Sequence, residues 1–433
     1  MPALRLPGTF RALLAASFVS ALGGGLTLPF LVIYLHQVRH IPLGITGLLI
    51  GGVAILALPV GPAAGALVDH LGARKILLGA LVIEGVGIAS LATVHDTVSA
   101  VPAMFVFGLG QAAGWPTWNA LLGVMIRDEA MSRLAFARNF QLLNLGLGIG
   151  AVVGGLFVHV GHPATFVTVY LVDGTSNLVV VAVLALLPKS AFVADRHDGA
   201  ASRGAGVEER PSGGHGYRAV LSDGVFRRYL AMMTILMIAG YAAVDTGFVG
   251  FATTVVKAGP GTIAVAFAAN TTVIVLSQPL ALRLAARMRF TSALKVVAGA
   301  FAASWVVLAS AGLVPGSTTG RVLVVGTMAV FAAGEVLLSP VNGPLVNALA
   351  PPELRGRYFA ASSMCMTVAS IVSPAISGAM IGTGFGLLLL CLFVACCGLA
   401  VGGAQWLRLS LTDRQDRQPA ISPSEGADGA AEA

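Results

Sequence analysis

The sequence predicts an all-α membrane protein with twelve transmembrane helices in two pseudo-symmetric halves of six. Three observations lead to this fold class. Of the 433 residues, 56% are hydrophobic and only 10% are charged, with a mean hydropathy of +0.87, which is not typical of a soluble domain. Apolar runs of about 20 residues, the length needed to cross a bilayer, recur along the chain. The two halves of the chain also resemble each other in sequence.

Charged residues and Pro or Gly turns divide the chain into twelve apolar runs. The first run could be mistaken for a secretory signal, because Arg5 and Arg11 precede it and small residues follow near Ser20. It continues unbroken to Tyr34, so we interpret it as a retained first helix. The predicted spans cover residues 10–36, 45–68, 75–94, 99–124, 134–159, 164–187, 228–254, 261–284, 293–313, 321–349, 357–382 and 384–408.

Internal similarity divides the chain near its middle. The stretch "FRALLAAS" at Phe10 parallels "FRRYLAMM" at Phe226, and "GQAAGWPTWNALL" at Gly110 parallels "GEVLLSPVNGPLV" at Gly334. Such repeats are typical of secondary transporters, whose substrate site lies between the repeats. We expect an N-terminal six-helix bundle at 1–188, a cytoplasmic linker at 189–227, a C-terminal six-helix bundle at 228–411 and a disordered cytoplasmic tail at 412–433.

The basic residues indicate the orientation of the helices. With the N-terminus inside, outward-facing segments hold only three of the 26 Lys and Arg residues, namely Arg39, Lys257 and Arg321. The positive-inside rule then places both termini in the cytoplasm of a multi-pass protein of the cell membrane, inner or plasma. Topology therefore accounts for the net charge of +7, and we expect the lipid bilayer rather than nucleic acid as a partner.

The loop after the second span, "GALVDHLGARK", resembles the signature loop of the major facilitator superfamily. His70 and Ala73 replace two arginines of that pattern. The resemblance implies the superfamily's two-bundle fold and a cytoplasmic conformational latch. The residues that match the pattern are Gly65, Asp69, Gly72, Arg74 and Lys75.

Further stretches resemble the drug:proton antiporters of this superfamily. They are "PPELRGRYFA" from Pro351, "GEVLLSP" from Gly334 and "NLGLGIGAVVGG" from Asn144, although Ala151 stands where the antiporter motif has proline and Met104 where the fourth span has a proton-coupling arginine. Small residues at four-residue spacing also serve ordinary close packing of membrane helices. The glycines in question are Gly146, Gly150, Gly154 and Gly155.

Four acids lie inside predicted spans: Glu84, Asp173, Asp245 and Glu335. A charged Asp at a helix centre costs roughly 2.5–3.5 kcal/mol, so each needs a partner, a wet cavity or a bound proton. The resemblance implies that the first, fourth, seventh and tenth spans line the cavity. We therefore predict that Asp245 and Glu335 face it and carry protons, whereas Glu84 and Asp173 are either functional or structural.

Polar and aromatic residues at helical spacing mark three of these spans, and each set shares one helix face. Such stripes are typical of a binding cavity or, alternatively, of polar contacts between packed helices. Aromatic rings and acids without basic residues favour hydrophobic, neutral or cationic compounds. The candidate substrate-binding residues are Gln111, Trp115, Trp118, Asn119, Tyr241, Phe248 and Asn342.

The sequence therefore predicts a monomeric secondary transporter, not an enzyme, that exports hydrophobic or cationic drug-like compounds in exchange for protons. The alternatives are an exporter or importer of one metabolite (a sugar, an amino acid or a biosynthetic product) and a non-transporting membrane sensor. The partners expected are a small-molecule substrate and protons. We expect no cofactor and no metal, since the chain has neither a phosphate-binding GxxxxGK[ST] motif nor His and Cys at metal-binding spacing.

Overall fold

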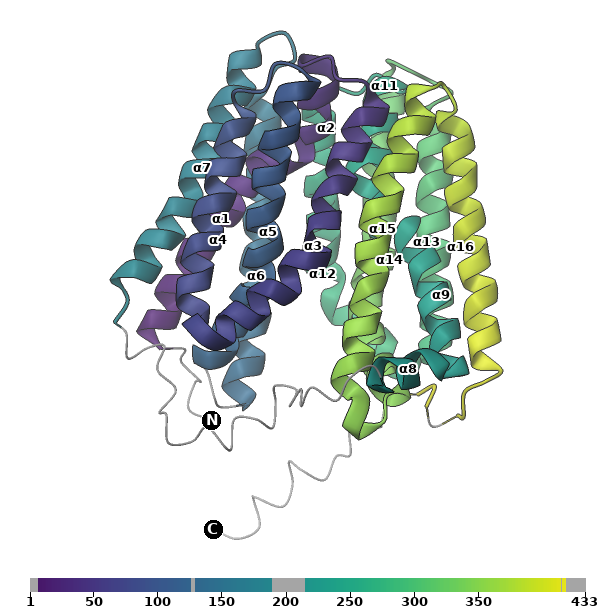
Figure 1. The fold of residues 1–433 in the computed structure, drawn as a ribbon. Helices are drawn as coiled ribbons and strands as arrows, with labels where there is room; N and C mark the ends of the chain where they lie inside the picture. Colours follow the sequence, from purple (N-terminus) through teal and green to yellow (C-terminus); the bar gives the residue numbers. More distant parts are fainter. Residues whose placement is uncertain (1–6, 126–128, 189–214, 414, 418–433) are drawn as a thin grey trace, which may run out of the picture.

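The computed structural model describes residues 7–125, 129–188, 215–413 and 415–417 of the chain. The part described is almost entirely helical, with long helices running side by side in one bundle (Figure 1). Its N-terminal half contains α1 (Gly8–Thr27), η1 (Leu28–Phe30), α2 (Leu31–Ile33), η2 (Tyr34–Val38), α3 (Leu43–Leu71), α4 (Ala73–Leu91), α5 (Thr97–Met125), α6 (Glu129–Phe157) and α7 (Pro163–Leu186).

The C-terminal half repeats this layout and begins with a short additional helix. It contains α8 (His215–Ser222), α9 (Gly224–Ile238), α10 (Tyr241–Ala243), η6 (Val244–Phe248), α11 (Val249–Thr254), α12 (Pro260–Arg287), α13 (Phe290–Ala311), α14 (Thr318–Leu349), η7 (Pro352–Leu354), α15 (Arg355–Gly382) and α16 (Gly386–Arg408).

Eleven helical segments in the described residues are long and apolar enough to cross a membrane. The one remaining predicted span, 75–94, corresponds to α4, which has 19 residues and carries Arg74, Lys75 and Glu84. These charges lower its apolar character, yet α4 packs lengthwise between α5 and α7 in the bundle (Figure 1). The predicted fold class is confirmed, with α4 as a span that carries three charged residues.

The first long helix of each half is interrupted at mid-depth. Helix α1 ends at Thr27 because Pro29, within the following 3₁₀ turn, has no N–H to donate to the preceding turn. In the other half α9 ends at Ile238, and a wide π turn follows at Val244–Phe248. Such π turns occur frequently at functional sites. The corresponding breaks place irregular backbone between the two halves.

Glycines bring the two halves together at one end of the bundle. A Cβ at Gly51 would lie 2.7 Å from the carbonyl oxygen of Ile371, and one at Gly47 would clash with the carbonyl of Pro374, so α3 and α15 touch backbone to backbone. Gly155 similarly lets α6 approach Ala264 of α12. At the other end the helices of the two halves lie apart (Figure 1).

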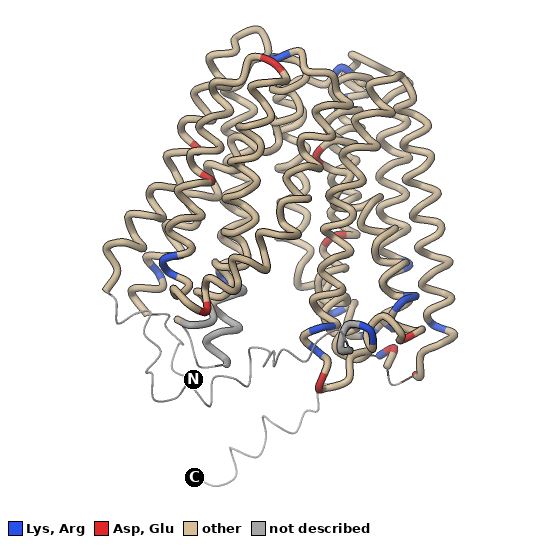
Figure 2. Tube along the Cα trace, viewed as in Figure 1, with Lys and Arg blue, Asp and Glu red and all other residues tan. Residues whose placement is uncertain are grey.

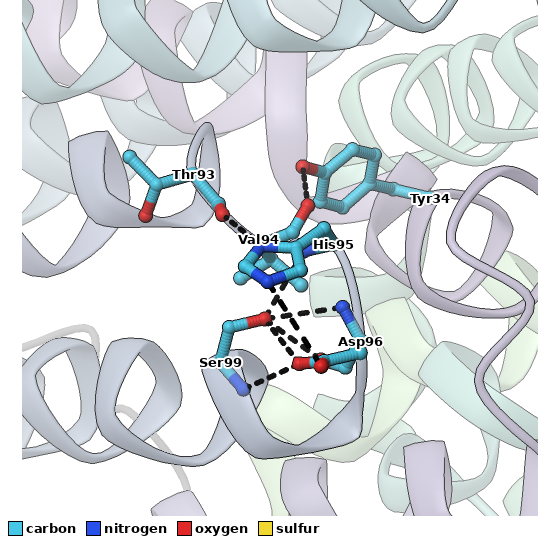
Figure 3. Close-up of polar contacts among 6 residues, drawn as sticks. All are labelled: Tyr34, Thr93, Val94, His95, Asp96 and Ser99. Carbon is cyan, nitrogen blue, oxygen red and sulfur yellow. Dashed lines mark hydrogen bonds and ion pairs between the residues drawn. The ribbon is translucent and has the colours of Figure 1, made fainter.

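Charge distinguishes the two ends. Figure 2 shows the basic residues gathered at the end where the halves lie apart, which we call the basic end. The opposite end carries Arg39, Lys257 and Arg321 as its described Lys and Arg residues. It also carries Asp96, which caps α5 by accepting hydrogen bonds from the N–H and hydroxyl of Ser99 at 2.8 and 2.7 Å (Figure 3).

The linker and the tail differ from expectation where the structure describes them. The range 189–227 contains α8 and the N-cap of α9, Asp223, whose second carboxylate oxygen accepts from Tyr358 at 2.8 Å. In the tail, Asp413 pairs with Arg289 at 2.7 Å, and buried Asp416 accepts from the N–H and hydroxyl of Thr291. The start of the tail is therefore ordered because it satisfies the first turn of α13. Residues 189–214 and 418–433 lie outside the described residues.

Candidate functional site

A cavity of about 590 Å³ lies between the two halves. Its walls come from the interrupted first helix and from α3 and α5 in one half, and from α10, η6 and α15 in the other. The residues that line it are Leu28, Leu31, Val32, Ile50, Val53, Ala54, Ala57, Gly61, Met104, Phe107, Gln111, Ala112, Trp115, Pro116, Ala242, Asp245, Met366, Thr367, Ser370 and Pro374.

Asp245 is the acidic residue among these lining residues. It lies in the π turn of the interrupted seventh span, and its side chain is exposed to the cavity although the residues on either side of it are buried. In the described part of the chain its carboxylate makes no hydrogen bond or ion pair with another residue. A proton or a cationic ligand can therefore neutralise it, and water in the cavity can solvate it.

Gln111 and Trp115 of α5 line the cavity as predicted from their spacing. The Trp115 side chain is 65% exposed, so its ring is available to a ligand. Asn119, one turn further along, donates to the carbonyl of Trp115 at 3.2 Å and lies outside the cavity wall.

Trp118 does not face the cavity. It is only 9% exposed and packs in a cluster with side chains such as Leu13 of α1, Leu77 of α4 and Leu184 of α7. At Trp118 the predicted α5 stripe faces the other helices of the N-terminal half. We predicted that Trp118 binds substrate, and in this arrangement its large ring instead fills an interhelical core.

Tyr241 and Phe248 also lie outside the cavity wall. Phe248 is fully buried and packs edge-on against Phe267, with ring centroids 6.2 Å apart. Tyr241 stands edge-on to Phe301 and Phe331. The predicted stripe assumed regular helical spacing, whereas the π turn between Val244 and Phe248 changes the register and leaves Asp245 alone on the cavity side.

Glu335 is held between helices rather than presented to the cavity. Its Oε2 accepts a hydrogen bond from Nδ2 of Asn270 at 3.1 Å, and the hydroxyl of Tyr241 also hydrogen-bonds to it. The side chain therefore joins α14 to α12 and α10. We expected Glu335 in the cavity wall. It is not among the lining residues, and two neighbouring helices supply its hydrogen-bond partners.

Asn342 is likewise part of a contact between helices. Its Oδ1 accepts from the hydroxyl of Tyr229 at 2.6 Å, and the same hydroxyl lies 2.7 Å from Oγ of Ser362. This network ties α14 to α9 and α15. The polar stripe of the tenth span thus consists of hydrogen bonds between helices, the alternative that such spacing leaves open.

Sequence reasoning missed the contribution of the second and eleventh spans to the cavity. Helix α15 presents Met366, Ser370 and Pro374 at four-residue spacing, with Thr367 beside them. This stripe was a usable signal, but it is weakly polar and contains no charge. Thr367 and Ser370 give the wall opposite Gln111 its uncharged hydrogen-bonding groups.

The predicted latch forms the turn between α3 and α4 at the basic end. Gly72 adopts a φ of +86°, which favours glycine and permits the tight turn. Arg74 donates from Nη2 to the carbonyl of Ala185 at 3.0 Å and so ties α4 to α7. Asp69 and Lys75 are exposed, and a Cβ at Gly65 would meet no atom within 4 Å, so Gly65 does not mediate close helix packing here.

The glycines of α6 all lie at close contacts. A Cβ at Gly146 would lie 2.7 Å from Ala21, and one at Gly150 would lie 2.8 Å from Gly25, both in α1. Gly154 faces Phe30, while Gly155 reaches across to α12. The run therefore packs α6 against α1 and against the other half.

A second hollow of about 560 Å³ lies between α1 and α6. Arg11 and Arg138 line it together with apolar side chains such as Phe18 and Leu145. It has no residue in common with the wall of the central cavity. Arg11 and Arg138 therefore line a different hollow from the one that contains Asp245.

A model of the Major Facilitator Superfamily matches residues 13–374. The chain belongs to this superfamily. None of the curated proteins searched matches it. Among solved structures, the nucleoside transporter NupG resembles this superfamily member with a TM-score of 0.73 and 12% identity, covering 93% of this chain and 99% of NupG.

The peptide transporter POT in complex with alafosfalin is also similar, with a TM-score of 0.71, 14% identity and 96% of each chain covered. A POT family transporter in complex with 5-aminolevulinic acid has a TM-score of 0.69 and 13% identity, covering 94% of this chain and 97% of that one. At such identities the likeness shows the fold. Together with the family, it makes this superfamily member a secondary transporter rather than an enzyme.

Proposed function

We propose that this transporter exports hydrophobic or cationic drug-like compounds in exchange for protons by alternating access. The observation that carries the proposal is the composition of the central cavity. Among the described residues that line it, Asp245 is the charged one, and apolar side chains and Trp115 form most of the remaining wall. A carboxylate and an aromatic face both attract organic cations, and the apolar wall accommodates their hydrocarbon parts.

In this mechanism Asp245 binds either a proton or a cationic substrate, because one carboxylate cannot be neutralised by both at once. Protonation from one side of the membrane releases the substrate, and deprotonation toward the other side restores the binding form. The two halves rock about the cavity between these events. The two halves touch where α3 meets α15 and lie apart at the basic end. This arrangement supports a cavity that opens toward the basic end.

We also propose that the basic end is cytoplasmic and that the transporter acts as a monomer in the cell membrane. The positive-inside rule supports the first statement, since the opposite end carries three described basic side chains. The second is supported by the cavity wall, to which both halves of a single chain contribute.

The second candidate is transport of one specific polar metabolite. Gln111, Thr367 and Ser370 favour it, because they give the cavity wall uncharged donors and acceptors on both sides. Two of the similar structures described above are a peptide transporter in complex with alafosfalin and a POT family transporter in complex with 5-aminolevulinic acid. Such a substrate would use these three residues as well as Asp245.

The experiment that separates these functions measures dye accumulation in a bacterial host that lacks its own exporters. We expect wild type to lower accumulation of a lipophilic cationic dye, and a protonophore to abolish the effect. Asp245→Asn should reduce the apparent affinity about tenfold or more, because it removes a charge-assisted contact worth roughly 1.5–3 kcal/mol.

The control is Asp413→Asn, which removes an exposed carboxylate far from the cavity and should leave export unchanged. Export that persists in Asp245→Asn would contradict the coupling role of Asp245. A wild-type protein that is well expressed but does not change dye accumulation would favour the metabolite carrier.

A further inference from the structure

Asp173 lies in a buried polar contact inside the N-terminal half, outside the central cavity. Its side chain is 2% exposed, and its Oδ2 accepts a hydrogen bond from the hydroxyl of Thr27 at the end of α1. Ser176 Oγ lies 3.4 Å from Oδ1 and donates to the backbone carbonyl of Asp173 at 2.7 Å. Gly23 makes this contact possible, because a Cβ there would lie 2.5 Å from Oδ1.

A second acid, Glu84 of α4, lies close to Asp173. The backbones of α4 and α7 touch at the next residues, since a Cβ at Gly85 would lie 2.8 Å from the carbonyl oxygen of Gly174. Gly110 and Gly114 of α5 leave room for the Glu84 side chain. Glu84 and Asp173 thus stand next to the two glycines at which α4 and α7 touch. In the described part of the chain no Lys, Arg or His pairs with either, so the site lacks a counter-charge.

A small cavity lies beside Thr27, the hydrogen-bond partner of Asp173. Its volume is about 10 Å³, close to the smallest space that holds a single water molecule. Thr27 and Tyr170 supply its polar wall, and the hydroxyl of Tyr170, in a side chain only 1% exposed, has no hydrogen-bond partner. An unpartnered hydroxyl facing a one-water space indicates a water that bridges Tyr170 to Thr27.

The small cavity borders the central one. Leu28, Leu31 and Phe107 line both spaces, so these side chains form a wall that the two cavities share. A path from the central cavity to Asp173 therefore crosses this apolar wall and then follows the small cavity and Thr27. This path enters at the break of the first helix, where Thr27 is the last residue of α1.

Other titratable groups near the acid pair, Tyr34 and Arg39, lie toward the end of the bundle opposite the basic end. Tyr34 stacks against Tyr170 with centroids 4.8 Å apart and donates to the carbonyl of Leu91 at 2.6 Å. Arg39 donates to the Tyr34 hydroxyl at 3.0 Å. Arg39 is thus engaged with Tyr34. The acid pair is left to neutralise itself, and two carboxylates that share a buried site do so by holding one proton.

We propose that Asp173 and Glu84 form a second proton-binding site, in the N-terminal half and separate from Asp245, which exchanges its proton with the central cavity through Thr27. A proton from cavity water passes to the water beside Tyr170. That water protonates the Thr27 hydroxyl as Thr27 transfers its own proton to Oδ2 of Asp173. The acid pair changes from two negative charges to one. This site does not depend on which compound the transporter carries.

Infrared difference spectroscopy tests the proposal without any substrate. The full-length protein in lipid nanodiscs is compared between pH 5 and pH 9, and the C=O stretching band of protonated carboxylic acids is recorded. We expect a pH-dependent band that Asp245→Asn retains and Asp173→Asn abolishes. Glu84→Gln, which leaves Asp173 in place, should shift the band in frequency.

A measurement of exchange kinetics keeps the proposal testable if Asp173→Asn fails to fold. Thr27→Val keeps the shape of the side chain but removes the hydroxyl, and should slow hydrogen–deuterium exchange of this band roughly tenfold or more. Two results would overturn the proposal. One is a set of bands fully accounted for by Asp245 and Glu335. The other is a carboxylate signal that responds to NaCl but not to pH, which would make this a sodium site.

Discussion

At the residue scale, Asp245 and Glu335 are both acids within membrane spans, but their surroundings differ. Asp245 is open to the central cavity and has no partner among the described residues, whereas Glu335 is bonded to Asn270 and Tyr241. A group without a protein partner is free to exchange a proton or bind a ligand. One held by two neighbours contributes to helix packing. The sequence identified both acids but could not show which of them had partners.

A residue outside the membrane gives a pH prediction with a definite sign. The backbone N–H and the hydroxyl of Ser99 donate to the Asp96 carboxylate and lower its pKa below the usual value, with a smaller contribution from His95, 3.9 Å away (Figure 3). The stabilisation is therefore present above the unfolded-state pKa of about 3.9 and is lost as the pH falls through the folded-state value.

We expect Asp96→Asn to have a lower melting temperature than wild type at pH 7, and the two proteins to converge as the pH is lowered to about 3. Thermal unfolding in detergent at a series of pH values measures this. A difference that stays constant down to the lowest pH would show that the charge of Asp96 is not responsible.

At the element scale, hydropathy predicted where the helices run, and the regularity of each helix decided how well the side-chain directions were predicted. In α5 the spacing correctly placed Gln111 and Trp115 on the cavity wall. In the seventh span the π turn at Val244–Phe248 shifted the register, so Tyr241 and Phe248 point elsewhere. Hydropathy does not signal such a turn, because it reports how apolar a segment is and not where the backbone hydrogen bonds change register.

The stripe of α14 leads to a prediction about stability. Tyr229, Asn342 and Ser362 share a hydrogen-bond network between three helices. We expect Tyr229→Phe and Asn342→Ala each to destabilise the protein by about 0.5–1.5 kcal/mol, and the double variant to lose less than the sum. Unfolding measured in a double-mutant cycle tests this coupling.

The same variants distinguish packing from binding. If Asn342 only joins helices, Asn342→Ala and Tyr229→Phe should leave the apparent affinity for a transported dye equal to that of wild type. A selective loss of affinity in Asn342→Ala, with stability unchanged, would restore Asn342 to the substrate site.

At the scale of the whole molecule, two close contacts hold the halves together at the end opposite the basic one. Gly47 and Gly51 place α3 against α15, and Gly155 places α6 against α12. Alternating access requires that these contacts separate. The absence of a side chain at Gly47 therefore stabilises the arrangement seen here, since a Cβ would have to displace the carbonyl of Pro374.

This argument makes Gly47→Ala a switch of conformational population. Overpacking at a tight contact costs about 1–3 kcal/mol, which changes the balance of two conformations roughly 5- to 150-fold. The cost applies where α3 and α15 touch and disappears once they separate. We therefore expect Gly47→Ala to favour the conformation that is open at this end.

Spin labels at Thr93→Cys and Thr383→Cys, in exposed loops of the two halves at this end, report the change as a longer distance, after exposed Cys391 is replaced by serine. Gly52→Ala is the matched control, because a Cβ there would meet no atom within 4 Å. Identical distance distributions for Gly47→Ala and Gly52→Ala in folded protein would mean that the contact at Gly47 does not set the conformational balance. A shift in Gly47→Ala alone would identify the α3–α15 contact as the gate at this end of the transporter.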